Sequence, residues 1–248
     1  MEQSTASEMA AGGLATQCDV HAGLIHDLRA AHLALLDDQE RDRAERYQLA
    51  AARDRFLLGA VLLRVAAGQS LGIRPADLAV DRTCGRCGSQ HGRPQLPGTG
   101  LHASVTHSGE VVAVALTRAG PVGVDVEAVR AIDFAAVADS VCAPAERNDV
   151  RTEADFFTFW TRKEAVLKAT GEGLSRPMRD LHVSAPSAAP VLLGLAAASP
   201  PPCQLADISA GDGYRGCVAV LTADPVAVRT LDASELLARA QVVAAWRE

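Results

Sequence analysis

The strongest constraint on the fold is an order of elements that occurs twice along the 248 residues. In the first half, RFLLGAVLLRVAAG lies in a helix expected over residues 37–68, which starts near Asp37 or Asp38 and stops at Gly68, and EVVAVALT, residues 110–117, is typical of a strand. In the second half, a core helix over residues 154–170 precedes the strand candidates LHVS, VLLGLA, CQLADIS and YRGCVAVLTADP. The pattern predicts an α+β fold, a pseudo-twofold pair of similar halves. Each half would be a mostly antiparallel sheet packed with a long helix.

The expected boundaries follow this order. Residues 1–20 are interpreted as a flexible N-terminal extension, residues 21–118 as the N-terminal half and residues 119–248 as the C-terminal half. The Ala/Pro-rich tract 185–202 is expected to be a loose hairpin loop.

Composition excludes several classes of protein. A formal net charge of −6 disfavours a general nucleic-acid binder, which would normally be basic overall. No apolar run reaches the ~18 residues of a membrane span, and the first residues lack a cationic start followed by an apolar core, so neither membrane insertion nor secretion is expected. The six cysteines are then expected to be reduced thiols in a cytoplasm.

Two of these cysteines stand apart from the others. The segment CGRCGSQH places Cys84, Cys87 and His91 at a spacing that suits zinc. A second ligand pair of comparable quality is missing downstream, so a glycine-rich turn without metal is the alternative.

The segment GVDVE, residues 123–127, carries two carboxylates on one face of a predicted strand. Alternate side chains share a face, so Asp125 and Glu127 point one way while Val124 and Val126 point the other. Unpaired like charges repel, and Mg²⁺ suits an all-oxygen site with few protein ligands. The alternative is an ordinary amphipathic strand with a solvated acidic face.

The segment FWTRKEAVLKATG, residues 159–171, reads as a half-buried helix that ends at Gly171. Glu164 and Lys168 are four residues apart and share a face, so a surface ion pair is one interpretation. If Glu164 meets Asp125 and Glu127, three carboxylates define a magnesium site, with Lys163 and Lys168 beside it for phosphate.

Together, in this order, the two segments resemble the signature pair of the 4'-phosphopantetheinyl transferases: a G-[IV]-D-[IV]-E strand and a W-x-x-K-E-A-x-x-K-A-x-G helix. SVTHSG resembles that family's S-H-S segment with Thr106 in place of the first serine, and HGRP and RFLLG resemble its G-[KR]-P turn and first core-helix motif. The similarity runs from about Arg41 to Leu221. The length of the chain is similar to that of the two-halved, surfactin-synthetase-activating type of the family. This resemblance implies a monomer that binds coenzyme A in a cleft between its halves.

The resemblance implies an enzyme that transfers the phosphopantetheine arm of coenzyme A to a serine of an apo acyl or peptidyl carrier protein and releases adenosine 3',5'-bisphosphate. It implies Mg²⁺, or Mn²⁺ in its place, and carrier proteins of polyketide, peptide or fatty acid synthesis in the cytoplasm. By resemblance, the catalytic residues are Glu164, Lys168 and His107, and the metal ligands are Asp125, Glu127 and Glu164. The coenzyme A contacts implied in the same way are Arg43, Arg55, Arg93, Pro94, Thr106, His107, Asp125, Lys163 and Lys168. A preceding basic position of the family falls on Glu40 here.

Two other functions remain open from the residues. The same carboxylates could serve a magnesium-dependent nucleotide or coenzyme A phosphohydrolase, with water as the nucleophile. Alternatively, Cys84, Cys87 and His91 could form the centre of a zinc-stabilised binding module.

Overall fold

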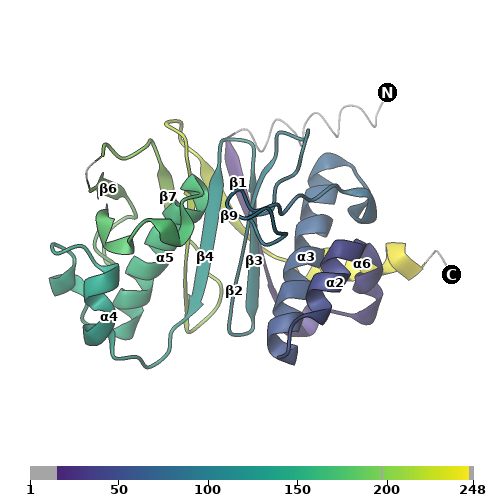
Figure 1. Cartoon of the computed structure of the whole chain (residues 1–248), viewed down its shortest axis with the longest axis horizontal. Helices are drawn as coiled ribbons and strands as arrows, with labels where there is room; N and C mark the ends of the chain where they lie inside the picture. Colours follow the sequence, from purple (N-terminus) through teal and green to yellow (C-terminus); the bar gives the residue numbers. More distant parts are fainter. Residues whose placement is uncertain (1–15, 197, 246–248) are drawn as a thin grey trace.

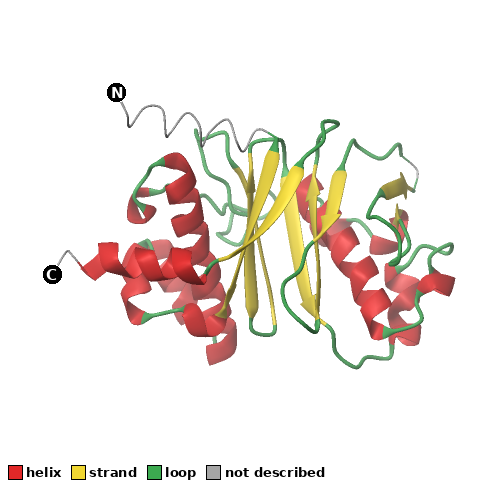
Figure 2. Cartoon of the chain, turned by 180° about the vertical axis from the view of Figure 1, so that it is seen from behind, coloured by secondary structure: helices red, strands yellow, loops and turns green. Residues whose placement is uncertain are grey.

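The computed structural model describes residues 16–196 and 198–245, which form two sheets side by side with helices on their outer faces (Figures 1 and 2). Residues 1–15 of the expected N-terminal extension lie outside the described residues, and the rest of that extension enters the first strand at Gln17. None of the described helices is both long enough and apolar enough to span a bilayer.

The N-terminal half holds a four-stranded sheet with the order β2-β3-β1-β9. Strands β1, β3 and β2 are antiparallel neighbours, and β9 joins β1 in parallel. The elements of this half are β1 (Gln17–Leu24), the 3₁₀ turns η1 (Ile25–Asp27), η2 (Ala30–Leu35) and η3 (Pro75–Asp77), α2 (Asp38–Glu45), α3 (Ala50–Leu71), β2 (His102–Ser108), β3 (Val111–Thr117), β9 (Ala227–Asp232) and α6 (Ser234–Ala245).

The C-terminal half holds an antiparallel sheet with the order β4-β8-β7 and a separate β5-β6 hairpin. Its long helix α5 lies against β4 and β8. The elements are β4 (Val122–Ala128), α4 (Phe134–Val141), η4 (Arg147–Asp149), α5 (Glu153–Thr170), η5 (Gly173–Ser175), η6 (Met178–Asp180), β5 (Leu181–Val183), β6 (Leu192–Leu195), β7 (Gln204–Asp207) and β8 (Tyr214–Val220). The expected α+β pair of halves, each with a long helix on a mostly antiparallel sheet, is confirmed.

Three hydrophobic clusters fill the space between the layers of helices and sheets. One fills the space between α3 and its sheet, and a second lies between α5 and the C-terminal sheet. The third joins the inner faces of the two sheets through residues such as Val20 on β1, Ala113 on β3 and Val124 on β4. Strand β3 is buried along its whole length because it is covered on both faces, so the halves share one continuous interior.

Hydroxyl groups join the edge of one sheet to the edge of the other. The amides of Val124, Val126 and Ala128 on β4 donate to the side-chain oxygens of Ser104 (3.1 Å), Thr106 (3.4 Å) and Ser108 (3.1 Å) on β2. We call these three β2 side chains the hydroxyl ladder. It satisfies backbone donors that would otherwise lie unpaired at a buried strand edge.

The closest helix–strand contact depends on a glycine. A Cβ atom at Gly123 would lie 2.0 Å from the carbonyl oxygen of Ala165 on α5. Only a residue without a side chain allows β4 and α5 to approach this closely. The first residue of the GVDVE segment therefore brings the helix of the second motif onto the strand of the first.

The expectation of one helix over residues 37–68 is wrong in two respects. The chain turns after Glu45, and α2 packs back on α3 through the buried Arg64, whose guanidinium binds Asp37 and Glu40 at the start of α2. At the other end, α3 continues past Gly68 to Leu71 and is capped by Gly72 in the left-handed region. Gly68 marks a close approach instead, because a Cβ atom there would meet the Ile73 oxygen at 2.7 Å.

The second helix agrees with the sequence. Thr152 and Asp155 form a capping box at the start of α5, and Gly171 ends it with a φ of 77°. The last elements of the chain differ from the expected division at residue 118, because β9 pairs with β1 and Leu237 of α6 lies in the N-terminal core.

The hydroxyl ladder generates a stability prediction. Thr106→Val keeps the shape of the buried side chain but removes the acceptor of the Val126 amide and a donor to Asp125. We expect the free energy of unfolding in urea to fall by about 1–3 kcal/mol, the cost of unpaired buried polar groups. Thr106→Ser, which keeps the hydroxyl, is the control and is expected to lose less. Equal stability of the two variants would contradict the role given to the hydroxyl.

Candidate active site

Asp125 is the most buried carboxylate of the predicted site, with 4% of the residue exposed. Its Oδ1 accepts hydrogen bonds from the Lys168 ammonium at 2.7 Å and from the Thr106 hydroxyl at 3.1 Å. Its Oδ2 is buried and has no hydrogen-bond partner among the described residues. Burial raises the pKa of Asp125, and the Lys168 charge opposes that rise. An unpartnered buried carboxylate oxygen is a strong acceptor for a cation or a donor from outside the chain.

Glu127 lies two residues further along the same face of β4 and is more exposed. Its Oε2 accepts a hydrogen bond from Ser108 at 2.7 Å, and Arg130 lies 3.4 Å from the same oxygen. The hydroxyl ladder thus orients both carboxylates of the GVDVE segment. The interpretation of that segment as a fully solvated acidic face is wrong for Asp125.

Glu164 faces these carboxylates from α5 and is half-buried. Burial raises its pKa, the Lys168 ammonium lowers it, and the negative charges of Asp125 and Glu127 raise it further. In the described part of the chain its carboxylate has no hydrogen bond and no ion pair. Lys168 binds Asp125 instead, so the surface ion pair between Glu164 and Lys168 does not form.

The donor set fits a hard divalent cation. Asp125, Glu127 and Glu164 offer only oxygen atoms, and Asp125 Oδ2 is free to bind. Their oxygens are more widely spread than the 4.8 Å that separates the ligand atoms of the Cys84, Cys87 and His91 group. Magnesium usually keeps several water ligands and takes one or two carboxylates directly, so it would bind some of these oxygens directly and the others through its waters.

Lys163 is a correction to the predicted contacts. Its ammonium is fully buried in the C-terminal half, where it binds the Glu146 carboxylate, the Val141 carbonyl oxygen at 2.8 Å and the Met178 carbonyl oxygen at 3.3 Å. Glu146 is itself 2% exposed. Lys163 is therefore part of the packing beneath α5 and does not face the carboxylates.

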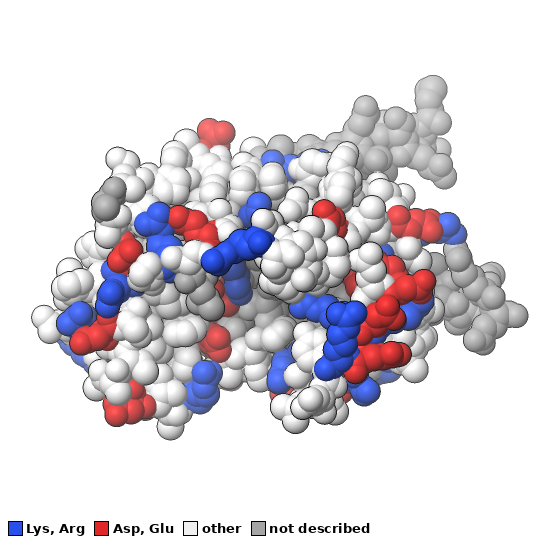
Figure 3. All heavy atoms as spheres, viewed as in Figure 1, with Lys and Arg blue, Asp and Glu red and all other residues white. Residues whose placement is uncertain are grey.

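A cleft of about 670 Å³ lies beside this cluster and is lined by both halves. Lys168 and Gly171 contribute from the end of α5, while His107 and Ser104 contribute from β2. The predicted contacts that line it are Arg43, Arg55, Arg93, Pro94, His107 and Lys168. Figure 3 shows Lys and Arg atoms on both sides of the hollow between the halves.

The arginines of the cleft bind backbone oxygens. Arg55 donates to the Gly109 carbonyl at 3.0 Å, Arg93 to Ala169 at 3.2 Å and Arg43 to Gln90 at 3.0 Å. Arg43 also lies over the ring of Phe56, 4.7 Å from its centroid. Within the described residues none of the three pairs with a carboxylate, so their charge is available for an anion.

His107 stands at the cleft end of β2. Burial lowers its pKa, and the cations Arg55 and Lys168 lower it further, while Glu127 opposes them. A neutral imidazole can donate a hydrogen bond to a phosphate oxygen without adding another charge to the cluster.

The structure also corrects and extends the predicted set. Glu40, which falls on a basic position of the resembled family, is buried and binds Arg64 at 2.6 Å, so it supports α2 and α3. Arg82 was missed: it lines the cleft, and its buried Nε has no hydrogen-bond partner in the part of the chain that the structure describes. In the sequence, the position of this arginine two residues before the CGRC turn was the feature that could have identified it as a cleft residue.

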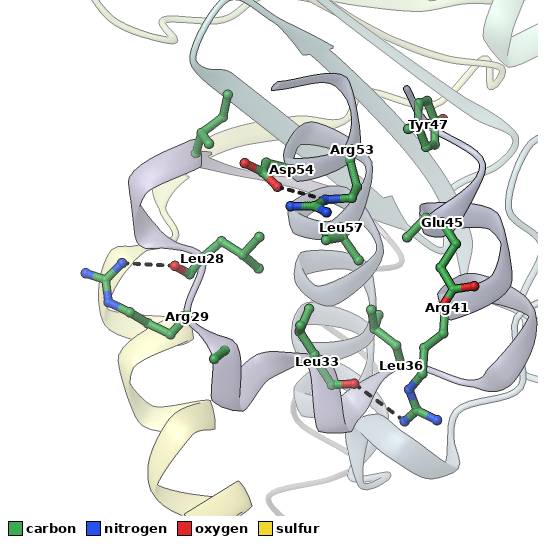
Figure 4. A pocket seen from close by; sticks show the side chains of 13 residues that line it. Leu28, Arg29, Leu33, Leu36, Arg41, Glu45, Tyr47, Arg53, Asp54 and Leu57 are labelled. Atoms are coloured by element: carbon green, nitrogen blue, oxygen red, sulfur yellow. Dashed lines mark hydrogen bonds and ion pairs between the residues drawn. The ribbon is translucent and has the colours of Figure 1, made fainter. Parts of the chain in front are cut away.

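A second cavity of about 540 Å³ lies in the N-terminal half among η2, α2 and α3 (Figure 4). Its leucine floor is flanked by Arg29, Arg41 and Arg53, and Arg53 faces Asp54 at 3.4 Å. It contains no residue of the C-terminal half. The carboxylate cluster is therefore separate from this cavity, whereas Lys168, the partner of Asp125, lines the cleft.

Comparison with known proteins supports the resemblance to the 4'-phosphopantetheinyl transferases. The sequence profile of the 4'-phosphopantetheinyl transferase superfamily matches residues 121–219, the segment that holds Asp125, Glu127, Glu164 and Lys168. Over this segment the chain is similar to members of that superfamily. The arginines of the cleft, Thr106 and His107 precede the matched segment.

Curated transferases of this superfamily match a longer part of the chain. The 4'-phosphopantetheinyl transferase psf-1 of Bacillus pumilus is 34% identical over 146 residues, 55% of this chain and 58% of that protein. HetI of Nostoc sp. is 31% identical over 154 residues, 58% of this chain and 62% of that protein. Sfp of Bacillus subtilis is 24% identical over 200 residues, 78% of this chain and 84% of that protein. The chain thus spans less than two thirds of the length of psf-1 and HetI.

The assignment of Lys163 to packing generates a prediction. Lys163→Met leaves the buried Glu146 carboxylate without its cation, so the free energy of unfolding should fall by about 3–5 kcal/mol. Adding Glu146→Gln removes the stranded charge, and this double variant is expected to recover part of the loss. Urea unfolding measures both. A Lys163→Met protein as stable as the unchanged chain would show that the pair is not structural.

Proposed function

We propose that the chain transfers the 4'-phosphopantetheine arm of coenzyme A to a serine of apo acyl or peptidyl carrier proteins, giving holo carrier protein and adenosine 3',5'-bisphosphate. The observation that carries this proposal is the position of Asp125, Glu127, Glu164 and Lys168 beside a basic cleft between the halves. The match of residues 121–219 to the superfamily profile and the named activity of the relatives support it.

In the proposed reaction, the serine hydroxyl oxygen attacks the β-phosphorus of coenzyme A. A phosphorus–oxygen bond to serine forms, and the bond to the oxygen of the departing adenosine 3',5'-bisphosphate breaks. Such transfer depends on positioning and charge neutralisation more than on covalent help from the protein. The cations around the cleft supply that neutralisation.

Glu164 is the proposed acceptor of the serine proton, directly or through a water. Its carboxylate has no hydrogen bond to other described residues, and burial together with the charges of Asp125 and Glu127 raises its pKa, which makes it a better base than an exposed glutamate. Lys168 would hold a phosphate oxygen and stabilise the charge of the leaving group. It can do so while it remains beside Asp125.

The other end of the cleft suits the nucleotide. Arg55 and Arg93 are proposed to bind near the 3'-phosphate and adenine, with Arg43 as a further contact and Pro94 in the turn that presents Arg93. Their planar guanidinium groups can each bond two phosphate oxygens. His107 would donate to the pyrophosphate.

Magnesium, held by Asp125, Glu127 and Glu164, would supply polarisation of the pyrophosphate oxygens. Manganese has the same preference for oxygen and is proposed as a substitute. We further propose a cytoplasmic monomer that serves carrier proteins of polyketide, peptide or fatty acid synthesis and contacts neither membrane nor nucleic acid. Light scattering in solution measures the monomer directly, and an obligate trimer would exclude it.

Metal removal tests the oxygen site. Purified chain is incubated with an apo carrier protein and coenzyme A, and intact mass spectrometry follows the gain of the arm on serine. We expect EDTA to abolish the gain and Mg²⁺ or Mn²⁺ to restore it, because these cations suit carboxylate ligands. Full modification in excess chelator would exclude the metal. Release of adenosine 3',5'-bisphosphate without any modified carrier would instead favour the phosphohydrolase.

Glu164→Gln separates a chemical role from a structural one. The change removes a ligand charge and a proton acceptor, so carrier modification should fall at least about a hundredfold, as for other well-placed electrostatic groups. The melting temperature should change little, because glutamine is a good helix former and Glu164 makes no ion pair in the described chain. Glu153→Gln in the first turn of the same helix is the control. Near-normal turnover of Glu164→Gln would contradict the assignment.

A further inference from the structure

The rim of the cleft is formed by a loop that has no helix or strand inside it. Asp81 and Gln95 exchange backbone hydrogen bonds of 3.0 and 2.8 Å at its base, and we call residues 81–95 the cleft loop. It contributes Arg82, Arg93 and Pro94 to the lining of the cleft. A loop of this length without regular structure needs another source of order to hold such residues in place.

Three soft ligands converge within this loop. The side-chain donor atoms of Cys84, Cys87 and His91 all lie within 4.8 Å of one another, the one group of its kind among the described residues. Cys87 Sγ lies 2.9 Å from His91 Nε2. The three residues span positions 84 to 91, so the spacing of the two cysteines alone does not bring the His91 ring to the sulfurs. The fold of the loop does.

The backbone holds the ligands in this arrangement. The Cys84 amide donates to the Ser89 carbonyl and the Gly88 amide to the Cys84 carbonyl, both at 2.8 Å. Gly88 has a φ of 72° with open space around it, so glycine is needed there for its conformation. The chain therefore reverses directly after Cys87 and returns His91 towards both sulfurs.

We propose that Cys84 Sγ, Cys87 Sγ and His91 Nε2 bind one Zn²⁺ ion, with water at the fourth position. Zinc prefers thiolate and imidazole ligands in a tetrahedron, with bonds of about 2.3 Å to sulfur and about 2.0–2.1 Å to nitrogen. In such a tetrahedron the ligand atoms lie about 3.5–3.8 Å apart. Cys87 Sγ and His91 Nε2, now 2.9 Å apart, would separate slightly as the ion enters, and all three ligand atoms would stay within the 4.8 Å of the present group. The two thiols lose their protons to solvent on binding.

This ion would be distinct from magnesium at the carboxylates. Soft sulfur ligands select zinc, whereas Asp125, Glu127 and Glu164 offer only hard oxygen atoms. The zinc would also be structural in its effect, because none of its ligands contacts the carboxylate cluster.

The cleft loop contacts both halves, so an ion bound in the loop would affect how the two sides of the cleft are held. Arg86 donates to Ser175 at 2.8 Å and Arg93 to Ala169 at 3.2 Å in the C-terminal half, while Arg43 of α2 donates to Gln90 at 3.0 Å. Zinc would fix the part of the loop that lies between these contacts. The cleft would then keep its basic rim in position before any anion binds.

The experiment measures metal on the full chain, purified in a non-thiol reductant and loaded with zinc before desalting. We expect about one zinc ion per chain by elemental mass spectrometry, and less than about a tenth of that in Cys84→Ser and in Cys87→Ser. Cys203→Ser, a cysteine outside the loop, is the control and should keep the ion. Cobalt loading should give thiolate-to-cobalt absorption in the unchanged chain and the control alone.

Two outcomes would overturn the proposal. One is an unchanged chain that retains no more zinc than Cys87→Ser. The other is a disulfide between Cys84 and Cys87 that persists in the reductant and blocks loading. Limited trypsin digestion tests whether zinc orders the loop. Trypsin should cleave after the exposed Arg86 faster once a chelator has removed the zinc. Equal cleavage rates with and without zinc would contradict an ordering role. Neither readout depends on carrier modification, so the transferase proposal can fail without affecting this one.

Discussion

The arrangement of the candidate active site depends on the hydroxyl ladder between the two sheets. The hydroxyls of Ser104, Thr106 and Ser108 each accept a hydrogen bond from a backbone amide of β4. Those of Thr106 and Ser108 also donate to the carboxylate of the residue just before that amide. A hydroxyl can do both at once, whereas a backbone amide or carbonyl cannot. The same three groups therefore hold the halves in register and aim Asp125 and Glu127. A shift of one half against the other would lose the contacts between the sheets and the orientation of the site together.

The cationic side chains in the interior of the halves and those in the cleft have different kinds of partner. Buried cations of the interior meet carboxylates: Arg64 binds Glu40, Lys163 binds Glu146, and Arg162 binds Asp207. Arg43, Arg55 and Arg93 of the cleft donate to carbonyl oxygens instead. A guanidinium already neutralised by a carboxylate gains little from a phosphate, while one held by a carbonyl keeps its full charge. A chain with a net charge of −6 can thus present a local site for a polyanion.

Local patterns predicted the helices and strands whose causes are local. Valine content predicted β3, the alternation of valines and carboxylates was interpreted as a strand at β4, and the end of α5 followed from Gly171. The break between α2 and α3 was missed because it is stabilised by Arg64, a residue distant in sequence from Asp37. The return of β9 to β1 depends on pairing between strands about 200 residues apart, which no local pattern carries.

The KE dipeptide in α5 shows why a motif predicts chemistry better than the role of each of its residues. Successive residues of an α-helix point about 100° apart, so Lys163 and Glu164 cannot serve the same site. Glu164 and Lys168, four residues apart, both lie near Asp125, while Lys163 turns inward to Glu146. Removing either residue of the dipeptide could abolish activity, one through the reacting groups and the other through the packing beneath the helix. Helical geometry separates these two causes, whereas adjacency in the sequence hides the difference.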